Sequence, residues 1–155
     1  DTDRDADNLE GYFQTFWQIL QYLHNDDAVP WPDKIPPRTD DPMWEFTFDG
    51  TPMFVVCCTP AHVKRRSRES STFLITFQPQ WVFEKIGPDT HAGKAARRVI
   101  RKRLVKFDGA MAPADVMGNY GDPDNLEWKQ YFLPDTKDPD PESPLQRCPF
   151  RHSHA

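Results

Sequence analysis

The sequence predicts an α+β fold, in which an antiparallel β-sheet is covered by helices and long proline-rich connections join the elements. Two stretches of helical periodicity flank three short apolar runs of the kind that form strands. The chain has 16 prolines and only 7 glycines, which favours short elements and rigid turns. Aromatic residues make up 13% of the 155 residues, which excludes a disordered chain. We expect one domain over residues 1–155.

The first expected element is a helix that begins near Leu9 and ends near His24. Asp7, three residues before Glu10, resembles a capping box at its start. The helix should be deeply buried, because its apolar residues recur at steps of three and four. These residues are Leu9, Tyr12, Phe13, Phe16, Leu20 and Leu23. Residues 25–42 then form an ordered, irregular connection rich in proline.

Three strands are expected in the middle of the chain. Residues 44–48 alternate large apolar and polar side chains, and residues 53–58 form a more buried apolar run. Asp49-Gly50 lies between them and is a tight-turn signal, so the two runs should form a hairpin. Residues 72–77 are the third strand, and residues 81–83 can extend the sheet beyond Pro79.

A second helix is expected from about Thr90 to Phe107, ended by Asp108-Gly109. Its inner side is predicted to be lined by Ala92, Ala95, Ala96, Val99, Ile100, Leu104 and Phe107. Its outer side carries Arg97, Arg98, Arg101, Lys102, Arg103 and Lys106. A short strand or helical turn is expected around residues 127–133, and residues 135–155 should form an extended tail.

The charge of the chain is distributed unevenly. The net charge is −5, yet residues 59–107 hold twelve Lys and Arg against three acidic residues. Acidic flanks can neutralise such a basic centre within the protein, or the centre can bind an anionic ligand. A pI near 5.5 argues against nucleic acid as a partner.

Several classes of protein are excluded by what the sequence lacks. No apolar run is long enough to cross a bilayer. Three cysteines cannot form a disulfide framework, and the odd count suits a reducing compartment, so we expect a cytoplasmic protein. Nucleophile-elbow, phosphate-loop, metalloprotease and dinucleotide-binding motifs are missing. The chain opens with Asp-Thr-Asp, and we expect it to be a piece of a longer protein.

Three clusters of residues could carry chemistry. His62 follows a predicted strand and precedes a run of cations, as expected for an anion site next to an acid–base or ligating group, although a plain basic surface loop explains the same pattern. Cys148 and His152 near the end could bind a metal, but their spacing matches no zinc motif. Residues 118–129 are turn-rich and acidic, and could hold a cationic group or simply cap turns.

In order along the chain, a set of short blocks resembles the YqcI/YcgG family. The blocks are Gln21-Tyr22-Leu23-His24, Trp31-Pro32, Trp44-Glu45-Phe46, Thr59-Pro60-Ala61-His62, Arg66-Ser67-Arg68, Thr76-Phe77-Gln78-Pro79-Gln80-Trp81-Val82-Phe83, Ile100-Arg101-Lys102-Arg103-Leu104, Tyr120-Gly121-Asp122, Glu127-Trp128-Lys129-Gln130-Tyr131-Phe132-Leu133-Pro134 and Cys148-Pro149-Phe150. In the family, the position of Gln80 is more often Arg.

This resemblance implies a haem-dependent oxygenase that N-hydroxylates a guanidino amino acid such as L-arginine in natural-product biosynthesis. It implies a b-type haem with its iron, dioxygen or a peroxide as co-substrate, and an electron donor. Family proteins also carry an N-terminal portion with a Phe-Pro-Cys element that has no counterpart here. A missing N-terminal segment or a second chain could therefore complete the pocket. Exposed aromatic residues near the proline-rich connection are compatible with a homodimer.

Under this resemblance, the clusters can be assigned to haem and substrate. His62 is the first candidate for the axial ligand of the haem iron, with His24, Cys148 and His152 as alternatives. The cations that would pair the haem propionates are Lys64, Arg65, Arg66 and Arg68. The aromatic residues expected to line the haem slot include Phe77 and Trp81. The carboxylates expected to bind the guanidinium substrate are Asp122, Asp124 and Glu127.

Two further functions remain open from the sequence. The first is a non-catalytic haem-binding or sensor protein, which would show a haem spectrum without turnover. The second is an anion- or nucleic-acid-binding module that uses the basic helix at residues 97–106, whose affinity would fall steeply with salt.

Overall fold

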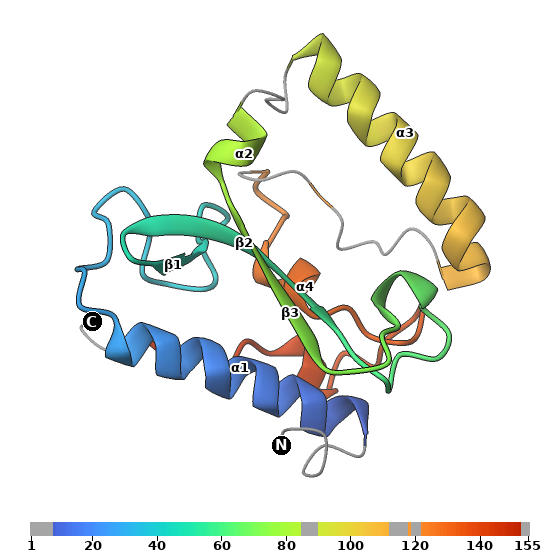
Figure 1. Cartoon of the computed structure of the whole chain (residues 1–155), viewed down its shortest axis with the longest axis horizontal. Coiled ribbons are helices and arrows are strands. Elements are labelled where there is room, and N and C mark those ends of the chain that lie inside the picture. The colour runs from blue at the N-terminus through green and yellow to red at the C-terminus, as the bar shows by residue number, and fades with distance from the viewer. Residues whose placement is uncertain (1–7, 85–89, 112–117, 119–121, 153–155) are drawn as a thin grey trace.

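The computed structural model describes residues 8–84, 90–111, 118 and 122–152, and its elements form an α+β arrangement, as predicted (Figure 1). The elements in chain order are α1 (Leu9–Asp26), β1 (Phe46–Phe48), β2 (Thr51–Cys58), the 3₁₀ helix η1 (Arg66–Arg68), β3 (Leu74–Pro79), α2 (Trp81–Glu84), α3 (His91–Asp108), the 3₁₀ helix η2 (Gly109–Met111), α4 (Trp128–Tyr131) and the 3₁₀ helix η3 (Pro144–Gln146). Among the described residues, no helix is both long and apolar enough to cross a membrane.

The helix α1 confirms the first predicted element and ends at Asp26, two residues beyond the expected position. Its N-cap is Asn8, whose side-chain oxygen accepts a hydrogen bond from the Gly11 amide at 2.8 Å. Asp7, which the sequence suggested as a cap, lies outside the described residues. The apolar stripe of α1 is buried, as its periodicity predicted.

The sheet has the order β1-β2-β3, and both pairs of strands are antiparallel. Phe48 pairs with Thr51 across a two-residue turn, and both turn residues have positive φ, Asp49 at 50° and Gly50 at 65°. Hairpin turns of this length require such left-handed residues, which explains the Asp-Gly pair. The predicted hairpin and third strand are therefore confirmed.

The predicted extension of the sheet over residues 81–83 is wrong, because these residues form α2 instead. Pro79 pairs with Met53, and the Gln80 amide still donates to the Pro52 carbonyl at 2.9 Å. Since β2 begins at Thr51, no partner strand remains for the residues that follow. The chain turns into a helix where the pairing ends.

An aromatic core lies between α1, the sheet and α4. Phe16 is fully buried on α1, and Tyr131 is fully buried on α4. The core residues are Tyr12, Phe13, Phe16, Trp17, Leu20, Trp44, Phe46, Val55, Cys57, Trp128, Tyr131, Phe132 and Phe150. Edge-to-face ring pairs are frequent, for example Phe13 with Phe132 at 5.4 Å between ring centroids.

The segment predicted as an extended tail contains η3 and contributes Phe150 to the core. The side-chain amide of Gln21 on α1 holds this segment through two hydrogen bonds. Its Nε2 donates to the Arg151 carbonyl at 2.9 Å, and its Oε1 accepts from the Arg151 amide at 2.8 Å. The last described residues are thus part of the folded domain.

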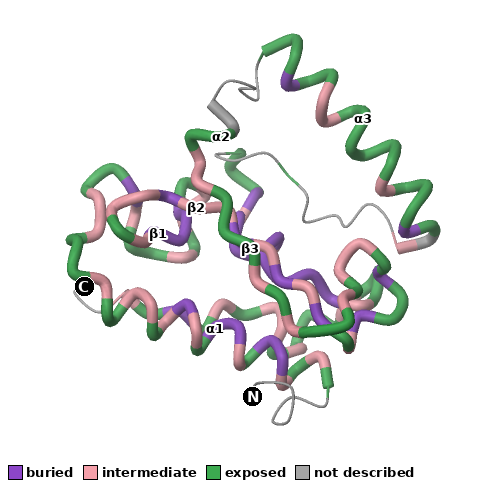
Figure 2. Tube along the Cα trace, viewed as in Figure 1, coloured by how far each residue is buried: buried purple, intermediate pink, exposed green. Residues whose placement is uncertain are grey.

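The predicted helix from Thr90 to Phe107 is confirmed as α3, but its predicted burial is wrong. Val99 and Ile100, expected on the inner side, are 49% and 54% exposed. Only Gly93 and Asp108 of this helix are buried. Figure 1 shows α3 standing away from the sheet, and Figure 2 shows it exposed along most of its length. The apolar face exists, but no described element covers it.

Candidate functional site

His62 is fully buried in the loop that follows β2, and both of its ring nitrogens have protein partners. Nε2 lies 2.8 Å from the Leu133 carbonyl, and Nδ1 lies 2.9 Å from the Thr59 hydroxyl oxygen. A carbonyl can only accept, so Nε2 carries the hydrogen and Nδ1 accepts from the hydroxyl. Burial lowers the pKa of His62, which favours this neutral tautomer.

The cations next to His62 are directed to different parts of the protein. Arg65 is buried and donates to three main-chain carbonyls, those of Pro134 at 2.9 Å, Met111 at 2.8 Å and Thr136 at 3.4 Å. Arg68 donates to another, the Gln130 carbonyl at 3.3 Å. The Arg66 guanidinium lies 4.6 Å from the centre of the Phe107 ring, whereas Lys64 is exposed.

Two carboxylates bind the backbone of the same loop. Asp135 accepts from the amides of Val63, Lys64 and Arg65, and Asp108 accepts from the amide and hydroxyl of Ser67 at 2.7 and 2.6 Å. Burial raises the pKa of Asp135, but the amide hydrogen bonds outweigh it, so the pKa lies below its usual range. Carboxylates of the chain itself therefore neutralise part of the basic centre.

The alternative iron ligands lie away from His62. The ring centroids of His24 and His152 are 5.0 Å apart. Both side chains line a cavity of about 440 Å³, together with Trp31. Cys148 lines a different cleft, of about 540 Å³, between α1 and the C-terminal segment. Burial raises the pKa of the Cys148 thiol to about 12, which disfavours the thiolate that would bind iron.

The positions of the predicted residues show whether they could together hold a haem group. Phe77 and Trp81, the predicted walls of the slot, are 38% and 61% exposed. The predicted ligands and counter-ions are bonded to other groups or lie in separate clefts, so they do not form a haem pocket among the described residues. Nor do three His, Cys, Asp or Glu side chains in this part of the chain come together to hold a metal ion.

The three carboxylates predicted to bind substrate in the acidic segment differ in how far they are buried. Asp122 and Asp124 are exposed, whereas Glu127 is only 6% exposed. A second buried carboxyl, that of Glu45, is 1% exposed just before β1, and its charge acts on Glu127. We call Glu45 and Glu127 the carboxyl pair. Burial first, and then the charge of Glu45, raise the pKa of Glu127 to about 8.

The hydroxyl of Tyr131 links the carboxyl pair to the sheet. It accepts from the Phe46 amide at 3.2 Å, and lies 3.1 Å from the Met53 carbonyl and 3.3 Å from Glu127 Oε1. A phenol has a single hydrogen, so it can serve only one of these two acceptors. A proton on Glu127 supplies the missing donor, which agrees with the raised pKa of this carboxyl.

Gln80 binds Glu45, the other member of the carboxyl pair. This residue follows β3, and its side-chain Nε2 donates to Glu45 Oε1 at 2.5 Å. It is half-buried, so it lies between the buried carboxyl and the surface. An amide N–H on a carboxylate oxygen reproduces one arm of the hydrogen-bonding fork that a guanidinium presents.

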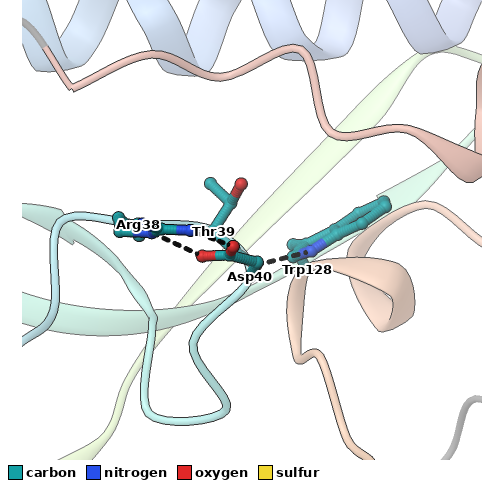
Figure 3. A network of polar contacts seen from close by, with 4 residues as sticks. All are labelled: Arg38, Thr39, Asp40 and Trp128. Carbon is teal, nitrogen blue, oxygen red and sulfur yellow. Dashed lines mark hydrogen bonds and ion pairs between the residues drawn. The ribbon is translucent and has the colours of Figure 1, made fainter.

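The neighbouring backbone fixes the position of Glu127. The indole Nε1 of Trp128 donates to the Thr39 carbonyl at 3.0 Å, next to the exposed ion pair between Arg38 and Asp40 (Figure 3). This bond joins α4 to the connection that precedes β1. It therefore ties the segment that carries Glu127 to the one that leads to Glu45.

Sequence reasoning identified Glu127 but missed Glu45 and Gln80. Glu45 occupies a polar position in an alternating strand, a pattern that predicts a solvent-facing side chain. Gln80 was noted only as a departure from the family. A carboxyl between two large aromatics, Trp44 and Phe46, was the available signal, since both flanking residues are buried.

Comparison with known proteins places this chain next to a group of bacterial proteins. The sequence profile of the YqcI/YcgG family matches residues 1–151. YqcI of Bacillus subtilis (strain 168) is 46% identical over 142 residues, and YcgG of the same organism is 42% identical over 145 residues. A Streptomyces lavendulae protein with the name "Putative N(omega)-hydroxy-L-arginine synthase DcsA" is 36% identical over 129 residues.

The matches cover most of this chain but only part of each relative. They include 92%, 94% and 83% of the chain, and 54%, 55% and 48% of YqcI, YcgG and DcsA respectively. The chain thus spans about half the length of these relatives. No solved structure was found to match it.

Proposed function

The chain belongs to the YqcI/YcgG family, and on this premise we propose that it forms part of an enzyme that N-hydroxylates the guanidino group of an arginine-like substrate. The name of DcsA supports the reaction class. The observation that carries the proposal for this chain is the carboxyl pair, because two buried carboxyl groups that interact electrostatically suit a planar cation with several N–H donors.

In this proposal, Glu127 and Glu45 bind and orient the guanidinium. Glu127 holds a proton near neutral pH, and a cation beside it lowers its pKa, so binding releases that proton. Gln80 moves off Glu45 and leaves its oxygen to the substrate. The reaction replaces one N–H hydrogen with a hydroxyl group, so it needs peroxide, or dioxygen with two electrons from a donor.

Isothermal titration with L-arginine tests the role of the carboxyl pair. Below pH 8, we expect affinity to rise by up to tenfold per pH unit, with proton release visible as a dependence of the heat on buffer. Glu127→Gln should weaken binding at least tenfold at pH 8. Glu142→Gln is the matched control, because the side chain of Glu142 is 81% exposed.

Substitutions of Gln80 provide a second test of the same site. Gln80→Arg should place its own cation on Glu45 and abolish arginine binding, whereas Gln80→Met removes the amide without adding a cation and should leave the site open. Equal affinity in wild type, Glu127→Gln and Gln80→Arg, or no binding at all, would contradict the proposal.

We also propose a b-type haem as the cofactor of the family-length enzyme, because oxygen insertion into an N–H bond needs an oxidising centre. Its pocket would need residues beyond those described here. Titration with hemin should therefore give a Soret band that saturates at one hemin per chain with full-length YqcI, and no saturable band with this chain. No band with YqcI would contradict haem, and a band with this chain would return His62 to consideration as the ligand.

A further inference from the structure

The apolar face of α3 is left open by the residues that the structure describes. Three large apolar side chains on this face are about half exposed. They are Val99 at 49%, Ile100 at 54% and Phe107 at 49%. The same face forms a shallow cavity of about 430 Å³, lined by Ile100, Arg103, Leu104, Lys106 and Phe107. An amphipathic helix gains its stability by burying such a face.

The contacts between described residues that attach this helix to the domain lie near its C-terminal end. Asp108 accepts from Ser67, and Arg66 lies over the Phe107 ring. The contacts of α3 with other elements are mainly those with η1 and η2, both near this end. Its middle projects from the domain and is mostly exposed (Figure 2). A contiguous apolar patch of this kind marks an interaction site.

Apolar side chains are also exposed on the outer part of the sheet. Leu74 and Phe77 on the edge strand β3 are 46% and 38% exposed. Trp81 and Val82 on α2, which follows β3, are exposed as well. The apolar surface left open by this chain is therefore larger than one helix face.

We propose that the α3 face is a docking surface for the part of a family-length polypeptide that lies outside the matched region. About half of each relative's length lies there, which is enough chain to form a second layer. Charge specifies the chemistry of the contact. Since the cations Arg103 and Lys106 line this face beside the apolar side chains, the docking segment should be amphipathic, with an apolar face bordered by acidic side chains.

The same charges argue against a second copy of this chain as the occupant. Two α3 helices packed face to face would bring together the Arg103 and Lys106 side chains that line this face in each copy, and like charges across an interface oppose association. This inference does not depend on the guanidino oxidation proposed above, since it concerns how the fold is completed.

Amide hydrogen exchange tests the docking. The comparison is between α3 in this chain and the aligned helix in full-length YqcI, whose match includes 92% of this chain. We expect the helix amides of YqcI to exchange at least tenfold more slowly, with YqcI monomeric by light scattering at all concentrations. Amides of α1 are the internal reference, because α1 is buried in the domain itself.

A variant of this chain shows whether the face is open. Val99→Asp combined with Ile100→Asp should reduce binding of an apolar fluorescent dye and leave Tm within about 2 °C of wild type. Val63→Asp, at a 74% exposed position outside α3, is the matched control and should leave dye binding unchanged.

Three results would overturn the docking proposal. One is equally fast exchange of the helix in monomeric YqcI and in this chain. Another is protection that appears only as YqcI dimerises, which would make a second copy the occupant. The third is a large fall in Tm in the double variant, which would show that the face already has a partner within this chain.

Discussion

Replacing Glu127 with glutamine is expected to make stability less dependent on pH. In the wild-type protein, titration of Glu127 should lower the free energy of unfolding by about 4 kcal/mol between pH 5 and pH 8, and the variant should lack this decrease. The pKa of Glu127 is raised from its ordinary 4.5 to about 8, so the folded state holds a proton that the unfolded state has lost. The free energy of unfolding therefore decreases as pH rises through this interval, at about 1.4 kcal/mol per pH unit. Glutamine does not titrate, and keeps the shape of the protonated acid.

The measurement is urea unfolding of wild type and Glu127→Gln at pH 5, 6, 7, 8 and 9. The difference between the two curves isolates Glu127 from the other titrating groups. We expect similar stability at pH 5, and a variant more stable than wild type at pH 9. Glu142→Gln should follow the wild-type curve, and parallel curves for Glu127→Gln would show that Glu127 is ionised in the folded state at neutral pH.

Replacing Arg65 with methionine is expected to lower the free energy of unfolding by about 3–4 kcal/mol. The side chain is 2% exposed and donates to carbonyls of Pro134, Met111 and Thr136. Methionine fills a similar volume but leaves these buried acceptors without a donor. Arg65→Lys should give an intermediate loss, because an ammonium group cannot reach three separated carbonyls in the planar geometry of guanidinium.

The matched control is Arg66→Met, one residue along the same loop. Arg66 is exposed and stacks on Phe107, a contact worth about 0.5–1 kcal/mol. Urea unfolding of the variants separates a structural role from the haem-binding role implied by the family resemblance. An Arg65→Met variant as stable as wild type would contradict the structural role of Arg65.

The elements that local patterns describe were predicted from the sequence, whereas long-range partners were not. The spacing in α1 and the Asp49-Gly50 turn predicted a buried helix and a hairpin, because periodicity and turn chemistry act over a few residues. The same periodicity in α3 identified an apolar face, but says nothing about what covers it. The 81–83 prediction failed because strand propensity cannot show where the partner strand ends.

The candidate site illustrates the same limit. Glu127 was selected for its charge, but the groups that act on it are Tyr131 and Glu45, which is 82 residues earlier in the chain. For His62, the sequence indicated the loop and its cations, but the partners of those groups come from Leu133 and Pro134. Hydrogen-bond partners this distant in sequence leave no local pattern to read.

The docking of Phe150 against α1 has a consequence for synthesis on the ribosome. The first helix emerges early, yet its aromatic stripe cannot be fully enclosed until Phe150 has been made and Gln21 can bind Arg151. Until then, the nascent chain carries exposed aromatic surface of the kind that chaperones recognise. The order of translation thus delays closure of this domain nearly to its last residues.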